Sequence, residues 1–194
     1  VKNIKKNNTA KRGDVLFLTK PIGVGVLSTA LKKGLLKEEH YKMFLQQMTR
    51  LNTIGESLGK VDSVHAMTDV TGFGLLGHLI EMAEGSGLSA ELNYSSIKTV
   101  GGIDEYLKQG IRPDATARNW NSYSSKVHFE KGVNVMEAFT LLPDPQTNGG
   151  LLIAAESSSV ELIQQLLTDN GYADHAEPIG QLTEQADKIV YVKP

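Results

Sequence analysis

Residues 64–87 bring together residue types that can hold a metal-bound phosphate. An apolar run beginning at Val64 ends in Asp69, a loop containing Gly72 and Gly74 follows, and an amphipathic helix starts near Gly74. A strand that delivers a carboxylate to a helix N-terminus places it beside free backbone amides and the positive end of the helix dipole. A cation bridging that carboxylate to a phosphate would be favourable there. Asp69 is therefore a candidate metal ligand.

The same loop, residues 72–77, matches the GxGxxG fingerprint of dinucleotide-binding proteins. It follows a predicted strand, and Glu91 lies about 20 residues further on, as that fingerprint requires. However, no second half of comparable pattern follows, and Asp69 precedes the first glycine by three residues. Two like charges ~4 Å apart repel by about 4 kcal/mol at an effective dielectric constant of ~20, so a carboxylate facing bare pyrophosphate is unfavourable. A dinucleotide site is the weaker interpretation.

An interpretation without any ligand also stays open. The glycines could serve only a tight turn and close helix–sheet packing, with Asp69 capping the helix. His65, inside a predicted strand, and His78, on the helix, are interpreted as surface or internally hydrogen-bonded histidines. No His-x-x-x-His or Cys-x-x-Cys spacing supports a transition-metal site.

Two further polar segments are candidates. Residues 144–150 must form a loop, since they and Pro143 contain two prolines and two glycines. This loop could present Thr147, Asn148 and backbone amides to a ligand, or could simply be a rigid connection. Arg118, within residues 116–119, could bind a phosphate through its guanidinium or could be an ordinary exposed arginine.

The elements that would position these residues follow from periodicity and from turn residues. With 194 residues, 40% of them hydrophobic and 22% charged, the chain suits one globular domain. The predicted strands are residues 15–19, 64–67, 88–92, 127–129, 151–155, 179–182 and 189–192. The predicted helices are residues 26–33, 38–58, 74–85, 102–109, 133–140 and 158–167, whereas 112–125 is a polar stretch without a predicted element. Because the last strands lie too close together for a crossover helix, we expect an α+β fold, an α/β sandwich with a mixed sheet packed with helices.

Composition and charge exclude several classes of function. A net charge of −2 argues against a general affinity for nucleic acid, although the first twelve residues are basic. No apolar stretch approaches the ~18–20 residues that cross a bilayer, and no signal peptide opens the chain, so we expect no membrane partner and a cytoplasmic location. The chain has no cysteine, which excludes disulfides, thiolate metal sites and cysteine nucleophiles within it. Because the start is polar and lacks Met, residues 1–13 are predicted to be a linker stump left from a longer protein.

Four motifs in order carry a specific resemblance. They are KPIGVGVL at 20–27, TDVTGFGLLGH at 68–78, TARN at 116–119 and DPQTNGGL at 144–151. From about Gly13 onward the chain resembles the C-terminal half of selenophosphate synthetase (selenide, water dikinase), in the ATP-binding superfamily of aminoimidazole ribonucleotide synthetase. The domain at 14–194 is then expected to have the fold of that superfamily's C-terminal domain.

The resemblance implies an ATP-dependent reaction that converts selenide, ATP and water into selenophosphate, AMP and phosphate. It implies Mg²⁺ ions held between ATP phosphates and aspartates, one of them Asp69, while Thr71, Gly72 and Gly74 would shape the phosphate side of the cleft. The other ligands and the catalytic cysteine or selenocysteine with its lysine would lie in an N-terminal domain. No catalytic residue is therefore expected in this chain, which would be inactive alone, and the full-length protein is expected to be a homodimer.

One position departs from the family pattern, and other functions remain as alternatives. Asn148 stands where serine is expected, a change to which we assign no functional effect because both side chains donate and accept hydrogen bonds. A related enzyme of the superfamily acting on a purine precursor would share the motifs. A non-catalytic domain that binds a protein partner through the helix at 38–58 would not need Asp69, and a NAD(P)-binding domain is the third alternative.

Overall fold

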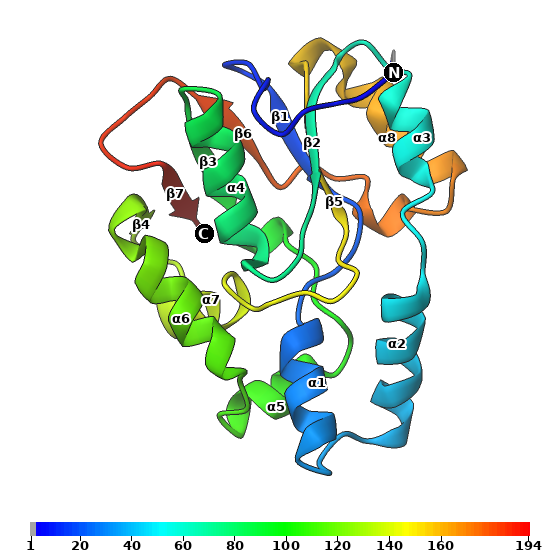
Figure 1. Ribbon diagram of the computed structural model, residues 1–194, viewed down its shortest axis with the longest axis vertical. Helices are drawn as coiled ribbons and strands as arrows, with labels where there is room; N and C mark the ends of the chain where they lie inside the picture. The colour runs from blue at the N-terminus through cyan, green and yellow to red at the C-terminus, as the bar shows by residue number, and fades with distance from the viewer. Residues whose placement is uncertain (1–2) are drawn as a thin grey trace.

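A mixed seven-stranded sheet forms the centre of the fold, as a computed structural model that describes residues 3–194 shows (Figure 1). The strands are β1 Val15–Leu18, β2 Val64–Asp69, β3 Ser89–Asn93, β4 Val127–Phe129, β5 Leu151–Ala155, β6 Gly180–Thr183 and β7 Val190–Lys193. Their order across the sheet is β2-β5-β1-β6-β3-β7-β4. Strand β7 pairs in parallel with β3 and β4, and the other pairs are antiparallel. The predicted α+β sandwich with a mixed sheet is confirmed.

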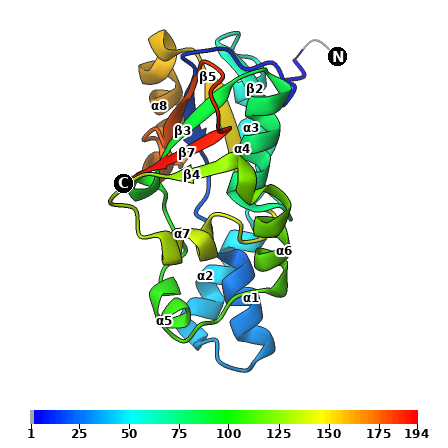
Figure 2. The same cartoon turned by 90° about the vertical axis from the view of Figure 1, so that its left-hand side faces the viewer.

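Helices cover both faces of this sheet and extend beyond it. They are α1 Val24–Lys32, α2 Glu38–Thr49, α3 Ile54–Gly59, α4 Gly74–Gly85, α5 Ile103–Lys108, α6 Asp114–Tyr123, α7 Val135–Leu141 and α8 Val160–Asp169. Figures 1 and 2 show α1, α2 and α5 gathered at one end of the molecule, with the sheet at the other. Among residues 3–194, no helix combines the length and the apolar character needed to cross a bilayer.

Alternating side chains of the central strands separate two hydrophobic cores. In β1, Leu16 and Leu18 point into the larger core, which also contains Leu79 of α4. The residue between them, Phe17, points into a smaller core with residues of α3 and α8, such as Ile163. Successive strand side chains point to opposite faces, so a strand buried on both faces is apolar throughout, as β1 is.

The predicted continuous helix at 38–58 is wrong, because the chain leaves the helical path at residues 50–53. Arg50 is extended (φ −68°, ψ 118°), and its carbonyl accepts hydrogen bonds from Lys20 Nζ and from Asn148 Nδ2, at 2.6 and 2.9 Å. The apolar spacing continues across the break, but it serves different cores. Phe44 of α2 lies in the larger core and Leu58 of α3 in the smaller one.

Helix α6 occupies part of the stretch for which no element was predicted. Its buried positions are Thr116, Asn119 and Tyr123, which have the spacing of one helix face. Two of these side chains are strongly polar, so a search for an apolar stripe does not find the helix. Pro113, directly before α6, is extended and marks its beginning.

Residues 3–12 form no helix or strand, yet they contact β2 along its length. The Met67 amide donates to the Lys6 carbonyl (3.1 Å), and the Thr9 hydroxyl donates to the His65 carbonyl (2.7 Å). Further along, His65 Nδ1 lies 2.8 Å from the buried carboxylate of Asp14. The assignment of 1–13 as an interdomain linker stays a prediction, and residues 1–2 of it lie outside the described part of the chain.

Replacing Phe17 by alanine tests the smaller core. Phe17 is fully buried, so we expect Phe17→Ala to lower the free energy of unfolding by about 3–5 kcal/mol through lost burial and a cavity. Phe73→Ala is the matched control, because Phe73 is 61% exposed and should cost less than about 0.5 kcal/mol. Urea unfolding followed by circular dichroism measures both, and equal losses would contradict the assignment of Phe17 to a core.

Candidate functional site

The loop at 143–150 joins the segments that carry the four motifs. On one side, the Val70 amide donates to the Gly150 carbonyl (2.8 Å) and the Gln146 amide donates to the Thr71 carbonyl (3.0 Å). These two bonds fix the loop against the chain that follows Asp69. The second and fourth motifs, far apart in the sequence, are therefore neighbours in space.

On its other side the same loop receives the beginning of α1. The Gly25 amide donates to Asp144 Oδ2 (2.9 Å), and the Val24 amide donates to Gln146 Oε1 (3.2 Å). These amides belong to the first turn of α1, where backbone donors lack helical partners. The loop thus caps α1 although the two are more than a hundred residues apart in the sequence. The first motif, at 20–27, therefore lies beside the second and fourth motifs, and we call this group of contacting motifs the cluster.

Helix α6 brings the third motif to the same place. Asn119 Nδ2 donates to the Gly72 carbonyl (2.7 Å) and to the Pro143 carbonyl (3.0 Å). Nearby, the Tyr123 hydroxyl donates to the Phe73 carbonyl (3.0 Å). One amide side chain therefore ties the glycine loop at 72–74 to the loop at 143–150, a role that spacing alone could not assign to Asn119.

Glycines occupy the points where these backbones touch. A Cβ atom added to Gly74 would lie 2.6 Å from the carbonyl carbon of Pro143, and Gly74 has a φ of +73°. A Cβ on Gly149 would overlap the carbonyl oxygen of Val70. By contrast, a Cβ on Gly72 would meet no heavy atom within 4 Å. The glycine pattern thus serves close packing at Gly74 and leaves Gly72 open to solvent.

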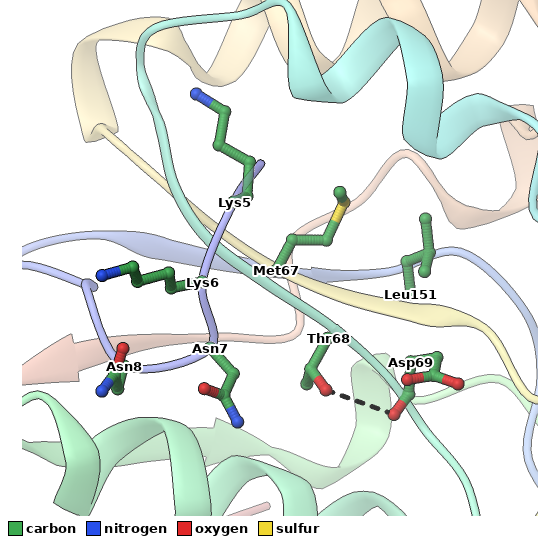
Figure 3. A pocket seen from close by; sticks show the side chains of 8 residues that line it. All are labelled: Lys5, Lys6, Asn7, Asn8, Met67, Thr68, Asp69 and Leu151. Carbon is green, nitrogen blue, oxygen red and sulfur yellow. Dashed lines mark hydrogen bonds between the residues drawn. The ribbon is translucent and has the colours of Figure 1, made fainter. Parts of the chain in front are cut away.

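Asp69, the last residue of β2, is exposed beside this cluster. Its carboxylate has no hydrogen-bond or ion-pair partner among the side chains of residues 3–194, and its backbone pairs with Leu151 of β5. It lines an open cavity of about 530 Å³ together with Lys5 and Lys6. Figure 3 shows both ammonium groups pointing away from the carboxylate. An unpartnered carboxylate of this kind is a suitable oxygen ligand for Mg²⁺.

His78 holds the loop that follows Asp69. The Thr71 amide donates to His78 Nε2 (3.0 Å), and the Thr71 hydroxyl lies 3.1 Å from the same nitrogen. Burial lowers the pKa of His78, against weaker opposing effects of Glu81 and Asp69, which favours the neutral ring that accepts these bonds. The interpretation of His78 as an internally hydrogen-bonded histidine fits its Nε2 contacts.

Lys20 and Asn148 fix the far end of the 143–150 loop. The fully buried Lys20 donates to the carbonyls of Arg50 and Asn148, and burial together with the Arg50 charge lowers the pKa of Lys20 to about 8. Asn148 has a φ of +51° and donates to the carbonyls of Met48 (2.8 Å) and Arg50. A serine hydroxyl carries one proton and could make only one such donation. Asparagine at this position therefore stabilises the loop in a way that serine cannot.

The predicted site residues are close together, but they differ in accessibility. Asp69 and Gly72 are exposed, Thr71 is half-buried against His78, and Gly74 is buried. Within the described residues 3–194, no three Asp, Glu or His side chains gather as a metal site. The metal role of Asp69 and the phosphate roles of Thr71, Gly72 and Gly74 stay predictions. Arg118 and Thr147 line a separate cleft.

Comparison with known families decides the relationship. Residues 11–193 match the model of the family "AIR synthase related protein, C-terminal domain". The chain belongs to this family.

Curated relatives narrow the relationship further. A selenide, water dikinase of Haemophilus influenzae is 46% identical over 190 residues, which is 98% of this chain and 53% of that protein. One of Aeromonas salmonicida is 45% identical over 179 residues, covering 92% of this chain and 50% of that protein. The resemblance to selenophosphate synthetases is therefore confirmed. The chain spans about half the length of these relatives.

Solved structures share the fold at low sequence identity. The hydrogenase maturation protein HypE of E. coli superposes with a TM-score of 0.68 at 18% identity, covering 97% of this chain and 48% of HypE. A thiamine-monophosphate kinase of Stenotrophomonas maltophilia gives a TM-score of 0.64 at 16% identity, covering 96% of this chain and 52% of that one. A HypE structure in complex with ATP has a TM-score of 0.69 at 16% identity, covering 99% of this chain and 50% of that one. These likenesses establish the fold.

Replacing Gly74 by alanine tests the close backbone contact. The left-handed φ and the overlap with Pro143 should together lower the free energy of unfolding by at least about 2 kcal/mol. Gly72→Ala is the matched control and should change it by less than about 1 kcal/mol, since its Cβ meets open space. Chemical denaturation measures both variants, and a Gly74→Ala protein as stable as Gly72→Ala would refute the contact.

The buried carboxyl of Asp144 predicts a pH dependence of stability. Burial raises the pKa of Asp144 from 3.8 to about 7, although hydrogen bonds from Gly25 and Gln146 oppose the shift. The folded state then holds a proton that the unfolded chain releases near pH 4, so this group's contribution to stability falls as pH rises from about 4 to about 7. The difference in unfolding free energy, Asp144→Asn minus the unaltered protein, should therefore increase as pH rises from about 4 to about 7. A difference that stays constant between pH 4 and pH 8 would contradict the raised pKa.

Proposed function

We propose that this chain is the C-terminal domain of a selenophosphate synthetase. Such an enzyme makes selenophosphate from selenide, ATP and water, with release of AMP and phosphate. The support is twofold: relatives named selenide, water dikinase match almost the whole chain, and the four motifs that carry the resemblance form one cluster in the fold. The observation that carries the proposal is the free Asp69 carboxylate at the edge of that cluster.

Asp69 would hold Mg²⁺ at the wall of an ATP cleft. When bound, the ion would neutralise charge on the phosphates. This chain's own residues would do the positioning: His78 and Asn119 fix the backbone at 71–72, while Gly74 lets α4 begin directly against the 143–150 loop. Thr71, Gly72 and Gly74 would then shape the phosphate side, with Gly72 as the accessible member.

The rest of the active site would belong to an N-terminal domain of the same protein. One carboxylate leaves most positions around Mg²⁺ to other ligands, since the ion takes six oxygen ligands. The chain spans about half the length of its relatives, which leaves room for such a domain. The N-terminal domain would bring the remaining aspartates and the nucleophile, the full-length protein would be a homodimer, and this chain alone would be inactive.

The decisive experiment rejoins the chain with the N-terminal half of a selenide, water dikinase relative and measures selenide-dependent AMP formation. We expect Asp69→Asn to lower the rate by more than about a hundredfold, since loss even of the outer partners of metal ligands costs 10–100-fold. The variant should also need more Mg²⁺ to reach half of its maximal rate. Asp62→Asn, which removes another exposed carboxylate, is the matched control and should keep full activity.

Three outcomes separate the alternatives. Full activity of Asp69→Asn would refute the metal-ligand role. AMP formation by the unjoined chain would refute the shared active site. Activity of the joined protein only towards a purine precursor, with none towards selenide, would identify a different enzyme of the same superfamily.

A further inference from the structure

A second cleft lies beside the 143–150 loop and does not include Asp69. It has a volume of about 540 Å³ and lies between α1 and the segment that begins α6, with Pro145 and Thr147 of the loop completing the wall. It shares no lining residue with the cavity at Asp69. The two cavities are therefore separate sites.

The cleft is strongly basic although the whole chain is slightly acidic. Four cationic side chains line it, those of Lys32, Lys33, Arg112 and Arg118, against the single carboxylate of Asp114. None of the four has an ion-pair or hydrogen-bond partner among the side chains and carbonyls of residues 3–194. Elsewhere, exposed lysines such as Lys126 do pair, here with Glu84 at 2.7 Å.

The residues of the wall suit an anion with several oxygens. Arg112 lies two residues before α6 and Arg118 lies in its second turn, and both line the cleft. A guanidinium binds phosphate oxygens through two parallel hydrogen bonds. The hydroxyls of Ser28 and Thr147 also line the cleft and make no hydrogen bond within the described residues. Thr29 differs, because its hydroxyl already donates to the Gly25 carbonyl (2.9 Å).

We propose that this cleft is a binding site for a phosphate group, carried by a small molecule or free in solution. A charge excess of three positive groups is relieved by a phosphate dianion, which can accept hydrogen bonds from both arginines and both free hydroxyls. The volume lies within the range of about 300–1,000 Å³ for small-molecule sites. The proposal is independent of the function proposed for Asp69.

The loop gives this site a direct connection to the metal-ligand segment. Gln146 lies between the two loop residues of the cleft, and its amide donates to the Thr71 carbonyl (3.0 Å). A phosphate bound to Thr147 would therefore also restrain the neighbouring Gln146. Through the Gln146 hydrogen bond it would restrain Thr71, which lies two residues after Asp69.

Titration of the ¹⁵N-labelled chain with inorganic phosphate at low ionic strength tests the proposal. We expect saturable shifts of the amide signals of Gly25, Ser28, Thr29 and Thr147. The double variant Arg112→Ala/Arg118→Ala should raise the dissociation constant at least tenfold. The control Arg12→Ala/Lys60→Ala removes the same charge from exposed, ion-paired positions and should stay within twofold.

Further arms separate the sources of the phosphate. Metal-free AMP that binds with additional shifts, while adenosine causes none, would identify a phosphate monoester; phosphate binding without AMP binding would identify the free ion. Absence of saturable shifts would overturn the proposal. So would equal weakening in both double variants, or shifts confined to Asp69, Thr71 and Gly72.

Discussion

Direct contact between backbones, with no side chain between them, is the constraint on which this domain depends. The 143–150 loop lies against the chain at 70–74 closely enough that a Cβ on Gly74 or Gly149 would overlap main-chain atoms. This contact sets where β2 ends, directly after Asp69, and where α4 begins. It also explains why motifs far apart in the sequence are rich in glycine, since each supplies one side of the same contact.

Buried polar groups give this cluster a unique arrangement. Near the start of the loop, Asp144 accepts a hydrogen bond from the Gly25 amide of α1. Near its end, Lys20 donates to the carbonyl of Asn148 and to that of Arg50, the residue directly after α2. Leaving such a group unpaired in the interior is costly, so alternative positions of the loop are disfavoured more strongly than apolar contacts alone would achieve. The resulting rigidity suits a loop that is bonded to the chain after Asp69 and also lines the basic cleft.

The sequence predicted those elements whose periodicity is apolar and whose ends carry turn residues. Strands β1 and β5 and helix α4 are of this kind, and the mixed sheet followed from the spacing of the last strands. Helix α6 escaped prediction because Thr116 and Asn119 occupy its buried face, where they bind backbone groups that only the folded chain supplies. The break at Arg50 was not predicted for the same reason. The groups that bind its carbonyl, Lys20 Nζ and Asn148 Nδ2, come from distant parts of the sequence. Asp69 could be named as a candidate from its place at the end of an apolar run, and its metal role stays a prediction, whereas the contacts of Asn119 could not be foreseen.

The segment at 3–12 has a consequence for how copies of this domain meet one another. Strand β2 is the outermost strand on its side of the sheet. Two hydrogen bonds occupy part of its free edge: the Met67 amide donates to the Lys6 carbonyl, and the Thr9 hydroxyl donates to the His65 carbonyl. Unpaired strand edges are templates for adding strands from other molecules. The segment therefore shields the domain from edge-to-edge aggregation, and a version trimmed to begin at β1 would expose β2 to self-association.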